Sequence, residues 1–565
     1  MKPVKGRAQE TPQTPIGRVP EASAIRALLN EGTAHLQGGR LQEAEGAYRR
    51  ALDLAPNHPD ALHHLGLLLY RLSRFDEAIT TISRAIEQAP ASPLYSFNLG
   101  VVAQKASRPD EAIRAYRQAV TLNPRHLEAW INLGNALKDR GALPESIQAY
   151  QQALTVNPSH ADTHNNLGAA FKEQGKMERA LASYRQAIHL KPTHVEALNN
   201  LGLALMETGS LDEAIASFSQ ALTIMPGYLK ALYNLGVARS WAGEQEKAVD
   251  CLQRAATAKH DHAKPVTDAF VYRSRITHDL EQIRYLFERQ LLHDEHRPYF
   301  QALQQLDSEL RLRSDMGNRI PIAPQRLAPV AASYNRLLYR APNPHLPDGA
   351  LHPDLNVEAV ESRYLAQQPE VTFIDGLLNQ EALDALRRFC WESTVWKKDY
   401  ENGYIGAFLG DGFASPLLLQ IAEELRLKFP RIFKQHRLTQ AWAFKHDSTR
   451  RGLNIHADAA AVNVNFWITP DEANLNQETG GLVVYDKEAP RDWNFQEYNS
   501  DQNKPKILAW LKQVGAQTVK VPYRTNRAIV FNSDLFHETD EIAFKDEYLC
   551  RRINITLLYG FRRNG

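Results

Sequence analysis

The sequence predicts a multidomain protein, in which an N-terminal all-α superhelix of repeats precedes a C-terminal β-sandwich or barrel with flanking helices. Two observations predict this fold class. Glycine, proline and small residues recur every 34 residues in the first half of the chain. Short segments of alternating apolar and polar residues, separated by turn residues, fill the last third. A chain of 565 residues is also too long for one hydrophobic core.

Four parts of the chain are expected from these patterns. Residues 1–24 are rich in Pro, Gln and Thr, lack the apolar stretch of a secretory signal, and should form a disordered leader. The repeats occupy residues 25–262. Residues 263–365 contain two stretches with apolar spacing near 3.6, which predicts a helical cap and connector. Residues 366–565 form the C-terminal domain.

Composition excludes several classes of function. Lys and Arg number 66 against 65 Asp and Glu, so the chain lacks the basic excess of a nucleic-acid-binding protein. No apolar run approaches the length of a membrane span. Three cysteines, far apart and odd in number, argue against a disulfide framework. We therefore expect a cytoplasmic protein that contacts neither nucleic acid nor membrane, with homo-oligomerisation left open.

The repeat has a fixed internal pattern. Large residues occupy one repeat position and should be core: Tyr48, Tyr116, Tyr150, Tyr184 and Phe218. Glycine recurs at Gly32, Gly66, Gly100, Gly134, Gly168, Gly202 and Gly236, and proline at Pro56, Pro90, Pro124, Pro158, Pro192 and Pro226. Two antiparallel helices per unit fit this pattern, because proline stops the second helix. The array resembles the tetratricopeptide repeat in seven units.

A row of amides stands two residues before the repeated glycines: Asn98, Asn132, Asn166, Asn200 and Asn234. Asn is a mediocre helix former, so its repetition inside a helix suggests a role other than packing. An amide both donates and accepts, which suits binding to an extended peptide backbone. The row resembles the asparagine ladder of O-linked N-acetylglucosamine transferase, which implies a peptide-binding groove. Alternatively, these side chains hydrogen-bond neighbouring turns.

The C-terminal domain carries a pair of metal-ligand residues, His456 and Asp458. In an extended segment, a His-x-Asp step points both side chains to one face. The same step occurs at His352 and at His58, where loop or turn residues are expected. Only the copy at 456 is followed by an alternating strand, a Gly-Gly turn, a strand leading to His537 and a last strand that opens with arginine. Strands are expected at 371–375, 439–447, 454–458, 461–469, 480–486, 517–523, 527–533 and 551–560, and helices at 379–392 and 416–428.

This order resembles the double-stranded β-helix (jelly roll) of 2-oxoglutarate oxygenases, and especially the prolyl-hydroxylase group. The resemblance covers about residues 370–562. It implies that His456, Asp458 and His537 are the catalytic metal ligands, a facial triad of two histidines and one carboxylate. It also implies Fe(II), 2-oxoglutarate as co-substrate and ascorbate as a further candidate cofactor. The carboxylate ligand favours hydroxylation over halogenation.

Four further residues are candidate co-substrate contacts, together with Arg552. Alternation on the last strand places Arg552 and Thr556 on its inner, mostly polar face. The guanidinium could pair with the distal carboxylate of 2-oxoglutarate, as the family's arginine does. On the strand at 461–469, Asn463, Asn465 and Trp467 share one face, and plain packing is the alternative for them. Trp467 stands where the prolyl hydroxylases have a tyrosine.

The expected function is hydroxylation of a protein or peptide side chain, with the repeat arm recruiting the substrate. Two alternatives stay open: an oxygenase for a small molecule or glycan whose repeats dock a partner or oligomerise, and a scaffold that has lost activity. The long segment before residue 517 suggests a lid, in which Trp493 and Phe495 either close over substrate or pin the segment to the barrel.

Overall fold

The computed structural model describes residues 19–260, 270–313, 317–446, 449–450 and 455–562. The chain divides into two compact units, residues 1–208 and 209–565. Within the described ranges, no helix is both long and apolar enough to cross a bilayer. Residues 1–18 of the expected leader lie outside the described residues. Its last part is helical, since the first helix begins at Val19, ahead of the array's expected start at residue 25.

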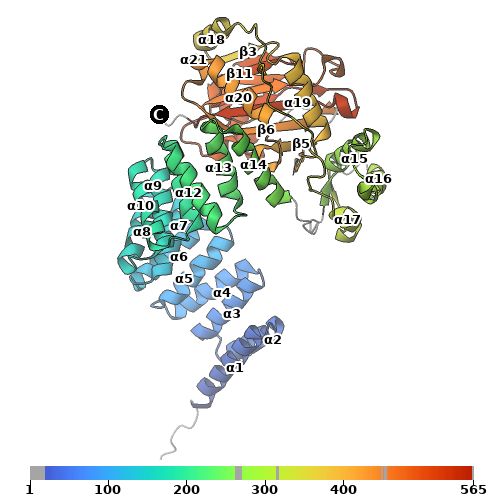
Figure 1. Cartoon of the computed structure of the whole chain (residues 1–565). Coiled ribbons are helices and arrows are strands. Elements are labelled where there is room, and N and C mark those ends of the chain that lie inside the picture. Colours follow the sequence, from blue (N-terminus) through green and yellow to red (C-terminus); the bar gives the residue numbers. More distant parts are fainter. Residues whose placement is uncertain (1–18, 261–269, 314–316, 447–448, 451–454, 563–565) are drawn as a thin grey trace, which may run out of the picture. The chain divides into compact units, whose positions relative to one another are not determined.

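The first unit consists of antiparallel helix pairs, as the 34-residue period predicts (Figure 1). Each second helix ends two residues before a repeated proline; α6, for example, stops at Leu122 ahead of Pro124. The helices are α1 (Val19–Gln37), α2 (Leu41–Leu54), α3 (Pro59–Arg71), α4 (Phe75–Gln88), α5 (Pro93–Lys105), α6 (Pro109–Leu122), α7 (Leu127–Asp139), α8 (Leu143–Val156), α9 (Ala161–Glu173), α10 (Met177–Leu190) and α11 (Val195–Glu207).

The repeated glycines make room for the aromatic rings of the second helices. A Cβ atom added to Gly134 would lie 2.5 Å from the ring of Tyr150, and one added to Gly100 would lie 2.5 Å from the ring of Tyr116. Such distances are far below van der Waals contact, so any larger residue would force the two helices apart. The predicted core position is confirmed, because all five of its large residues are at most 1% exposed.

Histidine rings cap four of the first helices, which the repeat pattern alone did not predict. α3, α7, α9 and α11 follow His58, His126, His160 and His194. Each ring Nδ1 accepts a hydrogen bond of 3.2–3.4 Å from the backbone N–H three residues further on. The rings therefore do what Ser, Thr, Asp or Asn do at most helix starts.

The second unit opens with three repeat helices and a small helical segment. The two predicted helices of the connector are confirmed as α15 and α16, and α15 packs on the β domain. The elements are α12 (Leu211–Ile224), α13 (Leu229–Trp241), α14 (Gln245–His260), β1 (Phe270–Tyr272), α15 (Arg273–Glu288), α16 (Arg297–Arg311), β2 (Arg319–Pro321), α17 (Pro324–Ala331) and α18 (Val357–Ala366).

Two larger antiparallel sheets and a two-stranded ladder of β7 and β13 form the β domain. One has the strand order β3-β11-β8-β14-β6-β5-β4 and the other β10-β9-β12. The strands are β3 (Val371–Ile374), β4 (Lys398–Asp399), β5 (Tyr404–Phe408), β6 (Leu438–His446), β7 (Thr449–Arg450), β8 (Val462–Trp467), β9 (Leu482–Glu488), β10 (Thr518–Val521), β11 (Ala528–Asn532), β12 (Leu535–Thr539), β13 (Ile542–Ala543) and β14 (Ile553–Tyr559). Helices α19 (Gln380–Glu392), α20 (Pro416–Lys428), α21 (Pro430–Phe433), α22 (Phe495–Tyr498) and α23 (Lys504–Gln513) flank them.

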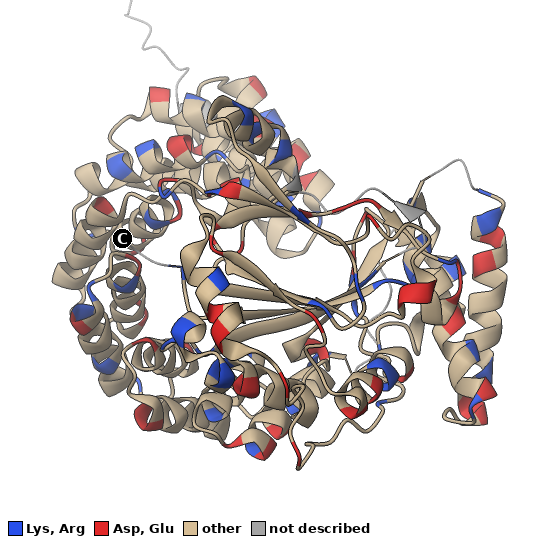
Figure 2. Ribbon diagram, turned by 90° about the horizontal axis from the view of Figure 1, so that it is seen from above, with Lys and Arg blue, Asp and Glu red and all other residues tan. Residues whose placement is uncertain are grey.

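Alternation along β14 separates the two faces of the larger sheet. Its apolar set packs outward against helices: Tyr559 donates to the Ala422 carbonyl of α20 at 2.8 Å and stacks near Phe433 of α21. The opposite set lies inside with the polar side chains of β8, and Thr556 pairs in register with Asn465. Figure 2 shows charges of both signs along the helices, whereas most strand residues carry none.

The last repeat pair is attached directly to the β domain within the second unit. α13 lies beside β6 (Figure 1). Trp241 of α13 donates its indole N–H to the Leu438 carbonyl at 2.6 Å, and the Tyr233 hydroxyl donates to the Thr439 carbonyl at 3.4 Å. The strand that receives these bonds also lines the pocket described below.

A small polar cavity lies between α15 and the outer face of β6. Lys445 of β6 is 2% exposed, and its Nζ has no hydrogen-bond partner in the described chain; it lies 3.5 Å from the ring centroid of Tyr548. His278 and Glu281 of α15 also line the cavity, each with one unpartnered buried atom. Burial lowers the pKa of Lys445 well below 10.5, and Arg551 adds to this effect while Glu281 and Cys390 oppose it.

Candidate metal centre and pocket

Three side chains from two segments far apart in the sequence converge at the β12 edge of the smaller sheet. His456 and His537 form an isolated antiparallel bridge, with backbone hydrogen bonds of 3.1 and 2.8 Å in the two directions. The backbone N–H of Asp458 donates to the Ser533 carbonyl at 3.1 Å. As a result, one potential ligand atom from each of His456, Asp458 and His537 lies within 4.8 Å of the others. The described part of the expected strand at 454–458 forms only this bridge.

The Asp458 carboxylate lies between the two imidazoles. Its oxygens are 3.5 Å from His537 Nε2 and 3.9 Å from His456 Nε2, and one of them accepts a hydrogen bond of 2.8 Å from Asn463 Nδ2. Burial by itself raises the pKa of Asp458. The hydrogen bond from His537 and the two imidazoles outweigh burial and hold this pKa below its usual value. The group is therefore an ionised acceptor in a nearly buried position.

The two imidazoles differ in their surroundings. His537 is 4% exposed in its side chain, and its Nδ1 lies 3.1 Å from the Leu535 carbonyl. That contact requires a proton on Nδ1, so Nε2, which faces Asp458, is the nitrogen that could bind a metal ion. His456 is 25% exposed in its side chain and faces a pocket. The candidate site thus has one inner and one solvent-facing imidazole.

Arg552 is fully buried inside the sheet layers, on the face that alternation predicts. Its guanidinium donates to the carbonyls of Gly480 and Gly481 and to Asn554 Oδ1, at 2.6, 3.4 and 3.0 Å. In the described residues, no carboxylate forms an ion pair with it, and burial lowers its pKa to about 10. Arg551, by contrast, points outward and pairs with Glu281 at 2.8 Å.

The other predicted contacts lie between Arg552 and the metal ligands. Asn465 Nδ2 donates to Thr556 Oγ1 at 3.0 Å, and Asn463 holds Asp458. Trp467 lies 5.7 Å from the Arg552 guanidinium. Three buried polar atoms here lack any hydrogen-bond partner within the described chain: Asn463 Oδ1, Asn465 Oδ1 and Trp467 Nε1. Plain packing does not explain such a cluster, because a buried polar group without a partner costs about 1–3 kcal/mol.

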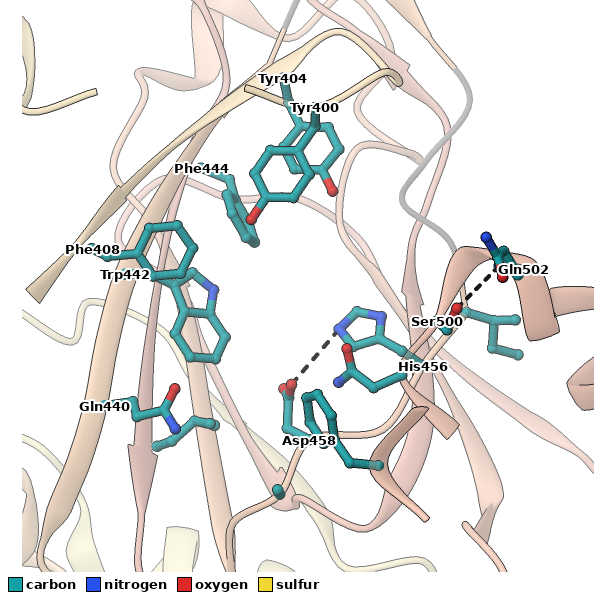
Figure 3. Close-up of a pocket in the computed structure, with 15 residues that line it drawn as sticks. Tyr400, Tyr404, Phe408, Gln440, Trp442, Phe444, His456, Asp458, Ser500 and Gln502 are labelled. Atoms are coloured by element: carbon teal, nitrogen blue, oxygen red, sulfur yellow. Dashed lines mark hydrogen bonds and ion pairs between the residues drawn. The ribbon is translucent and has the colours of Figure 1, made fainter. Parts of the chain in front are cut away.

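A pocket of about 520 Å³ opens beside His456 and Asp458 (Figure 3). One wall is aromatic and comes from β5, β6 and the residues before β5: Tyr400, Tyr404, Phe408, Trp442 and Phe444. The opposite side carries Asn499, Ser500 and Gln502. Trp442, Phe444 and Gln440 share one face of the predicted strand at 439–447, so alternation could have identified them. Tyr400 and Asn499 have no such signal in the sequence.

The long segment before β10 is partly helical. Its two aromatic residues, Trp493 and Phe495, differ in their surroundings. Trp493 packs on Trp510 and Phe536, with ring centroids 5.9 and 6.3 Å away, and so pins the segment to the domain. Phe495 is 51% exposed and lines the pocket. The other two His-x-Asp copies belong to no group of potential metal ligands within the described residues. His58 caps α3, and the Asp354 N–H donates to His352 Nδ1 in a loop.

The amide row of the repeats is half-buried at all five positions. Three amides donate to the preceding repeat: Asn98 to His63 at 2.8 Å, Asn166 to Asn135 at 3.3 Å and Asn200 to Asn165 at 3.0 Å. The row thus makes bonds between repeats, which was the alternative to peptide binding, while the side chains stay partly accessible. Both roles are compatible with this geometry.

Comparison with known families agrees with the repeat pattern. Residues 4–227 match the model of the Cilia and flagella-associated protein 70 C-terminal domain, and residues 205–265 match a tetratricopeptide repeat model. No curated protein matches the chain. The two matched models together extend from residue 4 to residue 265 and stop before the β domain.

Several solved structures are similar over a limited share of the chain. YrrB, whose structure is described as a TPR protein with an unusual peptide-binding site, is 25% identical; the match covers 32% of this chain and 93% of YrrB, with a TM-score of 0.28. MamA is 24% identical over 29% of this chain and 95% of its own, with a TM-score of 0.28. PilF of Pseudomonas aeruginosa is 18% identical; the match covers 40% of this chain and 99% of PilF, with a TM-score of 0.33. The N-terminal part of the chain, to about residue 265, is a tetratricopeptide repeat array.

Proposed function

We propose that the β domain is an Fe(II)- and 2-oxoglutarate-dependent oxygenase that hydroxylates a protein or peptide side chain. The observation that carries this proposal is the convergence of His456, Asp458 and His537 within 4.8 Å at the pocket. The pairing order supports it. β6-β14-β8-β11 within one sheet, and β12-β9-β10 with the His456 bridge in the other, is the order of a double-stranded β-helix.

The three side chains fit a divalent iron ion. Two imidazole nitrogens and one carboxylate oxygen are the donor set of non-haem Fe(II) sites that keep further positions open. The donors are also held as such sites require. Leu535 fixes the tautomer of His537, and Asn463 orients Asp458.

The interior beyond the ligands fits a dicarboxylate. Arg552 is a buried cation without a carboxylate partner among the described residues, and a guanidinium takes a carboxylate through two parallel hydrogen bonds. Two further donors lie on the same inner face: the Thr556 hydroxyl and the Trp467 indole N–H, which has no hydrogen-bond partner within the described chain. With metal, 2-oxoglutarate and dioxygen bound, the site would supply an oxidant able to hydroxylate an unactivated C–H bond, while 2-oxoglutarate would be converted to succinate and carbon dioxide.

The chain's own residues orient and shield that chemistry. Asp458 stays ionised; its Oδ2 accepts from Asn463 and faces His537, and its Oδ1 faces His456. Arg552 would hold the distal end of the co-substrate in the dry interior, away from the pocket. The aromatic wall would limit water at the reacting end, where substrate enters beside His456.

The pocket and the attached repeat helices support a protein substrate. The described walls present rings and amides, which suit an uncharged side chain flanked by peptide groups. Within the second unit, α13 of the last repeat donates hydrogen bonds to β6, which itself lines the pocket, so a segment bound on this last repeat would lie near that strand. A sugar or other small ring is a second candidate, because the aromatic wall would also stack on it.

The test uses two matched variants of the purified chain with Fe(II), 2-oxoglutarate and ascorbate. Asp458→Ala should abolish succinate formation and the gain of one oxygen in candidate partner proteins, since it removes a ligand. Asp354→Ala changes a His-x-Asp copy in a loop and should leave both unchanged. Iron-dependent hydroxylation that persists in Asp458→Ala would rule out the proposed site. Oxygen gain in free sugars, with none in proteins, would select the second candidate substrate.

A further inference from the structure

The segment from Asn494 to Asn503, which forms the rim of the pocket, is fastened to the backbone between two metal ligands. Ala457 lies between His456 and Asp458. Its N–H donates to the Tyr498 carbonyl at 3.1 Å, and its carbonyl accepts a hydrogen bond of 2.7 Å from Asn499 Nδ2. The rim segment therefore binds both polar groups of the one residue that sets the relative orientation of the two ligands.

Asn499 also acts on the charge of the ligand itself. Burial raises the pKa of Asp458, while His537, His456 and the Asn499 amide lower it. The Asp458 carboxylate accepts its hydrogen bond of 2.8 Å from Asn463. Asn463 belongs to the sheet, whereas Asn499 belongs to the rim and bonds the backbone between the two ligands.

The rim segment is stiff and faces the pocket. Asn494 and Glu497 close a capping box around α22, and Asn503 Nδ2 donates to the Gln496 carbonyl at 2.8 Å. Phe495, on the same short helix, is 51% exposed and lines the pocket. Ser500 and Gln502 of the rim lie across the pocket from the aromatic wall (Figure 3). A group that enters the pocket meets the segment that holds Ala457.

We propose that Asn499 is a positioning residue that sets the geometry of the His456–Asp458 ligand pair from the pocket rim. The inference rests on the proposed metal site and goes beyond it, because Asn499 is not a ligand. Without its amide, the Ala457 carbonyl loses this hydrogen-bond partner. The backbone bonds of His456, Ala457 and Asp458 would remain, but the peptide between the two ligands would be oriented less strictly.

Co(II) binding tests this role without any substrate or turnover. Visible absorption of Co(II) reports ligand geometry, and a titration gives the affinity. Asn499→Ala should weaken Co(II) binding about 10- to 100-fold, as loss of an outer hydrogen bond to a metal ligand does, and should change the ligand-field bands. Asn503→Ala removes another amide donor of the segment, and Phe495→Ala removes its pocket-facing ring. Both should bind Co(II) like the parent.

The outcomes separate this inference from the proposed function. If the parent does not bind Co(II), or if Asp458→Ala binds it equally well, the proposed metal site itself is wrong. If the parent binds Co(II) and Asn499→Ala shows the same affinity and spectrum, the site stands and Asn499 has no positioning role. If Asn499→Ala does not fold, Asn499→Ser, which keeps a donor on a shorter side chain, is measured instead. Unchanged Co(II) binding there would also contradict the inference.

Discussion

Replacing Arg552 with Met separates a co-substrate residue from a structural one. The guanidinium is completely buried, bonds two backbone carbonyls and Asn554, and has no acidic partner in the described residues. Without ligand, Arg552→Met should therefore not lower the free energy of unfolding by the 3–5 kcal/mol that breaking a buried ion pair costs. Met is an unbranched apolar side chain that removes the buried charge and, with it, the cation–π contact of 5.7 Å with Trp467.

The effect should appear when 2-oxoglutarate is added with Mn(II). At a concentration 100 times its Kd, a ligand stabilises the parent by about 2.7 kcal/mol. Removing one partner of a buried charge pair costs about 2–5 kcal/mol of binding, or about 30-fold or more in Kd. At the same ligand concentration, the stabilisation of Arg552→Met should fall to about 0.9 kcal/mol or less.

Urea denaturation with and without 2-oxoglutarate measures both quantities. Arg551→Met is the matched control, because Arg551 pairs with Glu281 on the outside. That variant should lose some stability without ligand and keep the full shift on adding 2-oxoglutarate. If Arg552→Met instead loses several kcal/mol without ligand and retains the 2-oxoglutarate shift, Arg552 is a structural residue and the co-substrate site lies elsewhere.

Two further predictions concern the cavity at α15 and the repeat amides. The lowered pKa of Lys445 means that unfolding takes up a proton below pH 10.5. Lys445→Met should therefore be more stable than the parent, and its advantage should grow by up to about 1.4 kcal/mol per unit as pH falls from 10 toward the folded pKa. A constant difference in urea stability across that range would contradict this. For the repeats, Asn132, Asn166 and Asn200 are changed together to Ala. Each lost amide bond should weaken binding of a full-length protein substrate by about 0.5–1.5 kcal/mol, so its turnover should fall, whereas turnover of a short peptide should not change. If the triple variant turns over both substrates like the parent, the arm is a docking device.

Much of the fold could be predicted because its signals are periodic. The repeated contact of Gly134 with Tyr150 lies within one helix pair, so the 34-residue pattern contains it. Alternation on β14 was enough to choose Arg552 over Arg551, since adjacent residues on a strand point to opposite faces. The start of α1 at Val19 was missed, because neither end of the array has a complete repeat around it.

The pocket was largely beyond prediction for a different physical reason. Trp442 and Phe444 alternate on a strand, but the side facing them comes from a segment whose path depends on tertiary contacts. Asn499 reaches Ala457 across the fold, and no spacing in the sequence marks that pair. The histidine caps were missed for a related reason. A histidine ring nitrogen replaces the usual side-chain oxygen of the cap, so histidine at this position does not predict a helix start.

Buried polar groups without a hydrogen-bond or charge partner support the proposal that the β domain carries chemistry. The matches to the repeat families end before this domain. A repeat array constrains many residues at a fixed period, whereas the proposed oxygenase site depends on a few residues scattered over the last third of the chain. Around those few, local rules of stability are broken together: Arg552 is buried without an acid, and the Asn465 and Trp467 side chains each leave a buried polar atom unbonded. Each exception costs free energy in the isolated domain. A charged dicarboxylate would compensate the Arg552 charge and could accept from the Trp467 indole N–H, an arrangement typical of a functional site rather than a packing core.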